Sequence, residues 1–186
     1  LVSTNEVEKS IEFFKANEAE ITLEQNQASE SEDYDEKTLI YNHVVGGGLN
    51  SGQDELRPMA EALVSKAVLL NEKNCFGDYP LSYLALGGHA DLVRIALSKG
   101  ANPNLGTYFA PLAAIFAPRE VSPKWSGIAE LLLESGANLN KDGSGKLPLL
   151  SAIERNHHDG SRFLVEKGAD LDVLRPLFSD GELKGT

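Results

Sequence analysis

The chain has 186 residues, about the size of one domain, and its 41% hydrophobic content is enough for a core of that size. The formal net charge is −11 and basic residues do not cluster, which disfavours a nucleic-acid partner because each phosphate contact needs a Lys or Arg. A single cysteine excludes an internal disulfide, and no apolar run approaches the roughly 18 residues that span a bilayer.

The negative charge is concentrated near the N-terminus. Residues 1–36 hold eleven acids and two bases, whereas the remaining chain is nearly neutral. Such a run is typical of a solvated segment, and the alternative is that it attracts a basic partner. The chain starts at Leu1, which indicates a cleaved export signal or an artificial chain boundary. The compartment is left open, with a cytoplasmic location favoured over a periplasmic or secreted one.

Residues 1–37 are expected to form a helix followed by an acidic loop. Val7, Ile11, Phe13 and Phe14 fall at spacings that favour one face of a helix. Residues 24–37 lack periodicity and indicate a polar loop. The helix is interpreted as a degenerate half-repeat that caps the segments that follow.

The first complete unit begins with Thr38-Leu39-Ile40-Tyr41 and has a hinge at Gly47. A polar insertion at residues 50–54 precedes a helix predicted from about Glu55 to Leu70, with Pro58 in its first turn, where proline costs little. This unit closes at Asn71.

Three further units share one pattern, a Pro-Leu opening, two short apolar helices and a Gly-Ala-Asn or Gly-Ala-Asp stop. They run from Pro80 to Gly100, from Pro111 to Gly136 and from Pro148 to Gly168. The first and third of these span 20 positions and the middle one 25. The difference predicts a five-residue insertion in an irregular stretch at residues 118–127.

These repeated openings and stops resemble ankyrin repeats, over about residues 38–172. The resemblance implies an all-α fold, an ankyrin-repeat solenoid of stacked antiparallel helix pairs with short finger turns. We expect one repeat domain over 1–186, with an N-terminal helix and acidic loop (1–37), the repeats (38–172) and a C-terminal cap and tail (173–186). The stop glycines are expected to adopt a left-handed conformation, which strains residues with a Cβ.

The resemblance also implies that a protein partner binds to the finger turns and the inner faces of the first helices. The predicted partner-binding residues are Phe76, Asp78, Leu86, Tyr108, Phe109, Trp125, Lys146 and Glu154. Further variable positions are Cys75, Gly87, Thr107, Ala117, Ser144 and Arg155. An aromatic side chain on a finger is a typical interface anchor, and the alternative is that it packs under the neighbouring finger. Trp125 either contacts the partner or fastens the insertion to the helices.

Two segments invite a chemical interpretation. The glycine-rich stretch at residues 46–52 lacks the lysine and the flanking pattern of a phosphate loop. His157-His158-Asp159 lacks a third metal ligand fixed by sequence, and His89 takes the position of His157 in an earlier repeat. His89 and His157 are therefore expected to bond backbone groups at a helix junction. We predict no catalytic residue, no metal and no cofactor.

The sequence thus predicts a non-catalytic protein–protein interaction module. We expect a dedicated inhibitor or immunity protein that occludes one protein partner, one with a basic surface if the acidic residues speed the encounter. A scaffold that holds several partners is the first alternative. An enzyme or cofactor-binding protein that uses the His-His-Asp or glycine-rich segment is the second.

Overall fold

The structure, a computed structural model, describes residues 44, 56–67, 69–73, 78–140, 147–172 and 174. These residues form helices and turns, and none of them lies in a strand. The helices are α3 (Arg57–Ser65), α4 (Pro80–Leu86), α5 (Ala90–Ser98), α6 (Pro111–Ala114), α7 (Trp125–Glu134), α8 (Pro148–Glu154) and α9 (His158–Glu166). Within these ranges no helix is long and apolar enough to cross a membrane.

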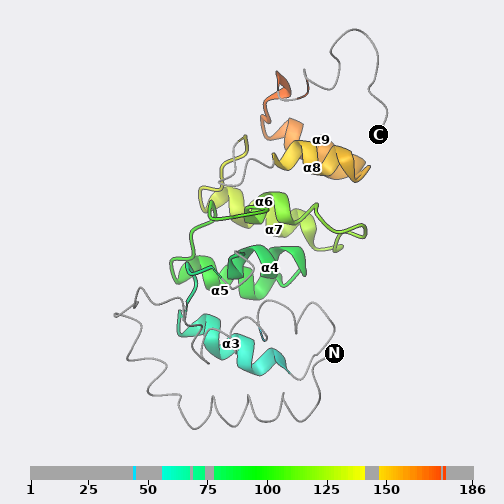
Figure 1. The fold of residues 1–186 in the computed structure, drawn as a ribbon. Coiled ribbons are helices and arrows are strands. Elements are labelled where there is room, and N and C mark those ends of the chain that lie inside the picture. Colours follow the sequence, from blue (N-terminus) through cyan, green and yellow to red (C-terminus); the bar gives the residue numbers. More distant parts are fainter. Residues whose placement is uncertain are drawn as a thin grey trace.

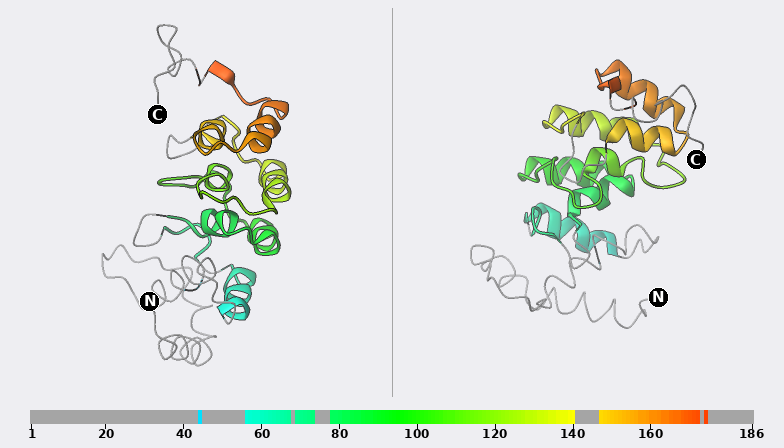
Figure 2. Two further views of the ribbon diagram at one scale, coloured as in Figure 1. Left: turned by 90° about the vertical axis from the view of Figure 1, so that its right-hand side faces the viewer. Right: turned by 45° about the horizontal axis from the view of Figure 1, so that its top comes forward.

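The helices form antiparallel pairs that stack along one direction (Figure 1). α4 packs on α5, α6 on α7 and α8 on α9, while α3 packs against α5 of the next pair. Seen from the side, α4, α6 and α8 make one column and α3, α5, α7 and α9 the other (Figure 2). The all-α solenoid predicted from the sequence is therefore the observed fold.

The hydrophobic core runs between the two columns and from one repeat to the next. Its largest fully buried side chains are Phe116, Leu56, Leu81, Leu84, Leu92, Leu112, Ile115, Ile128, Leu132, Leu164 and Val44. A single helix pair is too short to bury its apolar face, so each repeat depends on its neighbours for stability.

Proline sets the start of each helix in the first column. Pro80, Pro111 and Pro148 stand in the first turn of α4, α6 and α8, where the missing N–H leaves no hydrogen bond unmade. The residue before each proline is extended, with ψ of 147°, 157° and 131°. Proline disfavours a helical conformation in the residue that precedes it. The finger turn therefore meets its helix at a sharp, fixed angle.

The later helices of the second column, α5, α7 and α9, are each followed by a glycine with positive φ. Gly100, Gly136 and Gly168 have φ of +92°, +88° and +94°, which confirms the predicted left-handed stops. The equivalent position after α3, four residues before the closing asparagine, is Ala67 with φ of +59°. An alanine there is strained, because its Cβ crowds the backbone.

Two boundaries differ from the sequence prediction. The helix predicted to reach Leu70 ends at Ser65, because Ala67 and Leu69 both have positive φ. The irregular stretch predicted to reach residue 127 ends earlier, since the carbonyl of Ser122 accepts the N–H of Trp125 and α7 starts there.

Several predictions fall outside the described residues. They are the N-terminal helix and acidic loop, the opening at residues 38–41 with its hinge at Gly47, and the C-terminal tail. The finger positions Cys75, Phe76, Ser144 and Lys146 also lie outside them.

Candidate functional site

A hydrogen-bond ladder fixes the bases of the finger turns. The side chain of Asn71 donates to the carbonyl of Gly100 (3.0 Å) and accepts from the N–H of Asn102 (2.8 Å). Asn104 repeats both bonds with Gly136 (2.9 Å) and Asn138 (2.7 Å). Each asparagine therefore holds the loop of its own repeat against the loop of the next.

The third described rung keeps the acceptor bond of the ladder. Asn140 accepts the N–H of Asp170 at 2.8 Å. Within the loops, Asn102, Asn138 and Asp170 each accept the backbone N–H two residues further on. This local bond holds each loop in its turn conformation.

Repeats 1 to 4 are the units that begin at Thr38, Pro80, Pro111 and Pro148, and five residues come from the finger turns of repeats 2 and 3 or from helix α4 beside them. We call the surface formed by Asp78, Tyr79, Tyr83, Tyr108 and Phe109 the tyrosine face.

Two hydrogen bonds hold the tyrosine face together. The hydroxyl of Tyr83 donates to the carboxylate of Asp78 at 3.1 Å, which joins helix α4 to the turn before it. The hydroxyl of Ser82 donates to the backbone carbonyl of Phe109 at 3.0 Å, which brings the next finger beside the same helix. Residues about 30 positions apart in the sequence thus share one surface.

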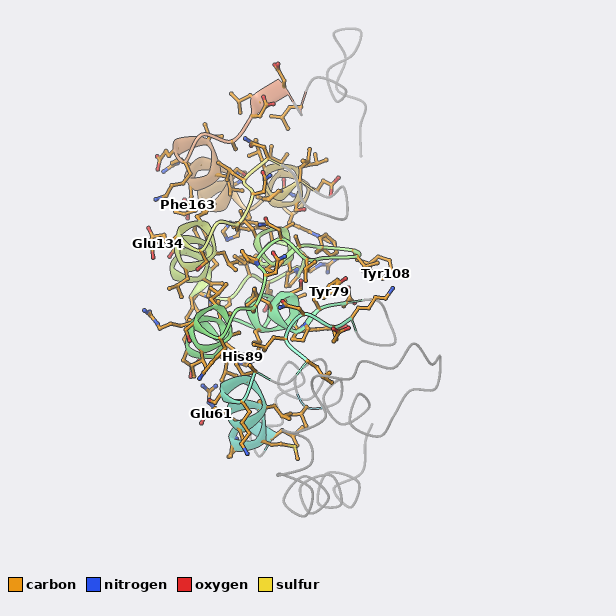
Figure 3. The ribbon with its side chains drawn as sticks, turned by 90° about the vertical axis from the view of Figure 1, so that its left-hand side faces the viewer. Glu61, Tyr79, His89, Tyr108, Glu134 and Phe163 are labelled. Carbon is orange, nitrogen blue, oxygen red and sulfur yellow. The ribbon has the colours of Figure 1, made fainter. Side chains whose placement is uncertain are left out.

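The tyrosine face is accessible. Tyr108 is 61% exposed at the tip of its finger, while Asp78, Tyr79, Tyr83 and Phe109 are half-buried. Tyr79 and Tyr108 lie on the finger side of the stack, whereas Glu61, Glu134 and Phe163 lie on the opposite side (Figure 3). The rings therefore offer contact area that is already partly fixed in place.

Burial raises the pKa of the Asp78 carboxyl, and the hydrogen bond from Tyr83 offsets part of this rise. Water therefore solvates this carboxylate less well than a surface carboxylate. The helices beside it, α4 and α6, contain no charged residue. Asp78 is thus the one acidic residue among the five that define the tyrosine face.

The other predicted site residues lie elsewhere. Leu86 ends α4 and is half-buried, and Glu154 ends α8 and is exposed. Of the predicted partner-binding residues, only Asp78, Tyr108 and Phe109 belong to the tyrosine face.

Trp125 belongs to a separate aromatic cluster at the start of α7. Its ring lies 5.8 Å from that of Phe116, 5.1 Å from that of His157 and 5.4 Å from that of Phe163, between ring centroids. The ring is half-buried. These contacts fasten repeat 3 to repeat 4, and a role for Trp125 in partner binding stays a prediction.

The enlarged connection in repeat 3 also contacts repeat 2. Gly88, with φ of +77°, is buried against Ser122, and a Cβ on Gly88 would stand 2.6 Å from the Ser122 Cβ. Val121 packs against the core from the same stretch. Together with Trp125 at the start of α7, this stretch therefore joins three consecutive repeats.

His157 has the structural role predicted for it. Its Nδ1 accepts the N–H of Gly160 at 2.9 Å and caps the N-terminus of α9. His89 precedes α5 at the same repeat position, where its side chain makes no such cap. Among the residues that the structure describes, no group of three His, Cys, Asp or Glu side chains could hold a metal ion.

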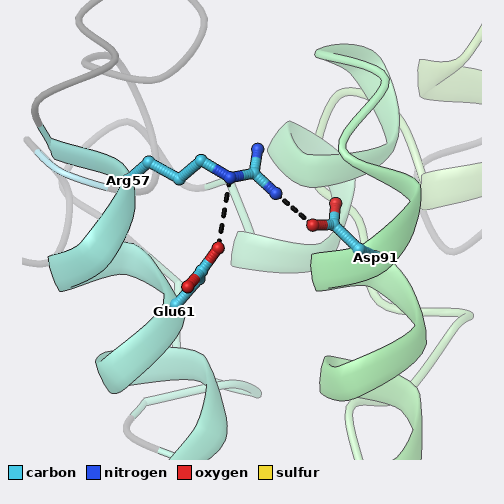
Figure 4. Close-up of polar contacts among 3 residues, drawn as sticks. All are labelled: Arg57, Glu61 and Asp91. Carbon is cyan, nitrogen blue, oxygen red and sulfur yellow. Dashed lines mark hydrogen bonds and ion pairs between the residues drawn. The ribbon is translucent and has the colours of Figure 1, made fainter.

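An ion pair joins the second helices of repeats 1 and 2. Arg57 of α3 pairs with Asp91 of α5 and with Glu61 one turn further along α3, at 3.1 Å from Nε to Oε1 (Figure 4). Burial by itself would raise the pKa of Asp91, but the hydrogen bond and charge of Arg57 outweigh it and the pKa is lowered.

The sequence analysis missed Tyr79 and Tyr83 as members of the site. Tyr79 precedes Pro80, and Tyr83 lies five residues after Asp78. One turn of helix separates positions three to four apart, so the spacing of Tyr83 from Pro80 would have placed it on the finger side of α4.

Comparisons with known proteins point to one kind of protein. No family model matches the chain. An ankyrin repeat protein of Rickettsia bellii is 25% identical over 150 residues, which cover 79% of this chain and 45% of the relative. An ankyrin repeat protein of fowlpox virus is 29% identical over 122 residues, which cover 66% of this chain and 17% of the relative. The chain thus spans less than half the length of these two relatives.

Solved structures show the same architecture. The ankyrin repeat domain of human ASB11 has a TM-score of 0.54 at 21% identity, covering 69% of this chain and 55% of that one. An ankyrin repeat domain from Acinetobacter baumannii has a TM-score of 0.53 at 21% identity, covering 84% of this chain and 97% of that one. The fold is therefore an ankyrin-repeat solenoid, and the sequence is similar to those of ankyrin repeat proteins.

Proposed function

We propose that the protein is a non-catalytic protein-binding module that recognises its partner through the tyrosine face. The ankyrin-repeat relatives support a protein–protein interaction module. The observation that carries the proposal is Tyr108, a large aromatic side chain 61% exposed on a finger beside four half-buried neighbours. Tyrosine is enriched at binding hot spots, because it buries much area at low entropic cost.

The finer proposal is a dedicated inhibitor or immunity protein that occludes one partner. The irregular connection lengths support it, since they give the surface an individual shape that a uniform array lacks. A dedicated inhibitor binds one partner at fixed stoichiometry, whereas a scaffold binds several. The total interface is expected to exceed about 1,000 Å².

The experiment is a pull-down from the native source with the 186-residue chain, followed by native mass spectrometry of what is captured. We expect one partner in a stoichiometric complex. Tyr108→Ala should weaken it by about 30-fold, the loss typical of an aromatic hot spot. Several partners would favour the scaffold.

Leu171→Ala is the matched control, because Leu171 is 53% exposed beyond α9 and apart from the tyrosine face. Its complex should keep the wild-type affinity. If the folded Tyr108→Ala protein also kept that affinity, the tyrosine face would not be the binding surface.

A further inference from the structure

The finger of residues 105–109 is held at its base from two sides. This finger carries Tyr108, which is 61% exposed and lies on the finger side of the stack (Figure 3). Its last peptide unit joins Phe109 to Ala110, directly before Pro111 and helix α6. Contacts to this peptide unit therefore set the angle at which the finger meets the helix.

The first contact comes from helix α4 of the preceding repeat. The hydroxyl of Ser82 donates to the carbonyl of Phe109 at 3.0 Å. Ser82 is 6% exposed and Ala110 is 4% exposed, so water has little access to this bond. A carbonyl that loses its donor where water cannot replace it is left unsatisfied at a cost in free energy. The bond therefore opposes any movement of the finger base away from α4.

The second contact comes from within the finger. Gly106 lies against the same peptide unit, because a Cβ on Gly106 would stand 2.4 Å from the nitrogen of Ala110 and 2.5 Å from the carbonyl carbon of Phe109. Both are backbone atoms, which a change of rotamer cannot move aside. Glycine permits this close approach because it has no Cβ. The turn therefore closes on its own base, with Tyr108 inside the closed loop.

The hydroxyl below this finger is not part of the repeat pattern. Ser82 stands two residues after Pro80, and the same position is Ala113 in repeat 3 and Leu150 in repeat 4. Neither alanine nor leucine has a side-chain donor. Because the fold forms without a hydroxyl at these two positions, the serine of repeat 2 has a local role.

We propose that Ser82 and Gly106 are positioning residues, which hold the finger of residues 105–109 in its binding conformation before the partner binds. Ordering a loop during binding lowers affinity, and a loop that is ordered beforehand avoids this loss. Ser82 and Gly106 thus act through Tyr108, the exposed ring that the finger presents. The inference rests on the proposed function, since it states how the same surface is prepared for the partner.

Nuclear magnetic resonance relaxation of the 186-residue chain tests the positioning without a partner. Backbone order parameters are about 0.85 for a rigid amide and below about 0.6 for a flexible one. We expect Tyr108 and Phe109 to have the rigid value in the wild type and to fall towards the flexible value in Ser82→Ala. Ser151→Ala is the matched control, because it removes the hydroxyl of a serine that is 4% exposed in α8. It should leave both order parameters unchanged.

The partner that the wild-type chain captures in the pull-down is the probe for the effect on binding. Ser82→Ala should weaken its affinity by about fivefold, whereas Ser151→Ala should leave the affinity unchanged. If Ser82 acts through Tyr108, the Ser82→Ala and Tyr108→Ala double variant should bind about as tightly as Tyr108→Ala alone. A serine that only stabilises the fold would instead give the product of the two losses.

Order parameters that stay at the wild-type value in Ser82→Ala, or losses of affinity that multiply, would each overturn the inference. Gly106→Ala should lower the same order parameters, because its Cβ forces the Phe109 to Ala110 peptide unit to move. This second variant decides the matter if Ser82→Ala fails to fold. A partner that depends on Tyr108 but binds Ser82→Ala with the wild-type affinity would overturn the inference and leave the proposed function standing.

Discussion

The two edges of the stack are held together by different interactions. At the finger edge, formed by the loops that close each repeat, Asn71 and Asn104 make the same pair of hydrogen bonds to the next loop. At the inter-helix edge, formed by the turns between the two helices of each pair, no such repetition occurs in the described repeats. There Ser122 packs on Gly88, and Trp125 packs on His157.

The difference shows which contacts between repeats recur along the array and which occur once. The finger edge repeats with the sequence, because every rung needs one asparagine at one position. The inter-helix edge depends on a single insertion that meets two neighbouring repeats. The first edge keeps the fingers in register, and the second fixes repeats 2, 3 and 4 relative to one another.

The largest effect is expected from removing the aromatic contact of the inter-helix edge. Trp125→Ala should lower the free energy of unfolding by about 3 kcal/mol, the low end for tryptophan because its ring is half-buried. Urea unfolding followed by circular dichroism measures it. Trp125→Phe, which keeps a ring against Phe163, should lose less than half as much. A loss below 1 kcal/mol would mean that the cluster does not hold the repeats together.

The contact between the insertion and repeat 2 should have the next largest effect. Gly88→Ala is expected to destabilise the protein by about 2 kcal/mol, part from its positive φ and part from the clash with Ser122.

Gly100→Ala separates these two causes. It has a similar positive φ with open space around its Cβ, so only about 1 kcal/mol is expected. Adding Ser122→Gly to Gly88→Ala should recover the difference. Equal losses at the two glycines, measured by urea unfolding, would show that the insertion does not press on Gly88.

One rung of the finger edge should matter less than the aromatic cluster. Asn104→Ala removes the bonds to Gly136 and Asn138 and should lower the free energy of unfolding by about 1.5 kcal/mol, since both bonds are exposed to water. Asn104→Asp keeps an acceptor for Asn138 and should lose roughly half of that. Thermal unfolding of the two variants beside the wild type gives the comparison, and an Asn104→Asp loss as large as that of alanine would rule out the acceptor bond as a contributor.

The first repeat offers a small gain in stability. Ala67 occupies the position where the later repeats have glycine, with φ of +59°. Ala67→Gly should raise the free energy of unfolding by about 0.5 kcal/mol, because relief of strain exceeds the added freedom of the unfolded chain.

Ala62→Gly in the interior of α3 is the control for that gain, and it should lower stability by about 1 kcal/mol. Urea unfolding distinguishes the two signs. A loss at both positions would mean that the alanine stop is not strained.

The smallest effect concerns pH. The lowered pKa of Asp91 means that its ion pair stabilises the fold above the ordinary value of 3.8 and that this contribution disappears as the pH falls through the lowered pKa. Asp91→Asn should therefore be slightly less stable than the wild type near neutral pH, and the two should converge in acid.

Asp78→Asn should instead be slightly more stable than the wild type near neutral pH. Burial raises the pKa of Asp78 above 3.8, so its charge lowers the free energy of unfolding as the pH rises through the raised pKa. Thermal melts from acid to neutral pH measure both. Parallel curves for the wild type and either variant would exclude a contribution from that carboxyl.

The periodic features could be predicted from the sequence. The Pro-Leu openings of α4, α6 and α8 and the stops at Gly100, Gly136 and Gly168 act within one turn of their own residue. Local features of this kind are fixed by backbone geometry, so their positions in the chain suffice. Tyr108 and Phe109 were likewise placed on a finger by counting from Pro111.

The early end of α3 was harder to predict, because nothing in the sequence at Ala67 and Leu69 demands a positive φ. Both residues have a Cβ and are ordinary helix formers. Their conformation follows from the need to bring Asn71 to the loop at Gly100 and Asn102. Packing against the next repeat therefore outweighed local preference.

The sequence by itself determined the Pro-Leu openings of α4, α6 and α8 and the glycine stops after α5, α7 and α9, and with them the order of the two helices in each of these three repeats. Only the tertiary structure decided that Tyr83 bonds to Asp78, that Ser82 holds the next finger and that Trp125 packs between repeats. The physical reason is the distance along the sequence over which each kind of interaction acts. Backbone preferences act over a few neighbouring residues, whereas these contacts arise from side chains that meet once the repeats have stacked.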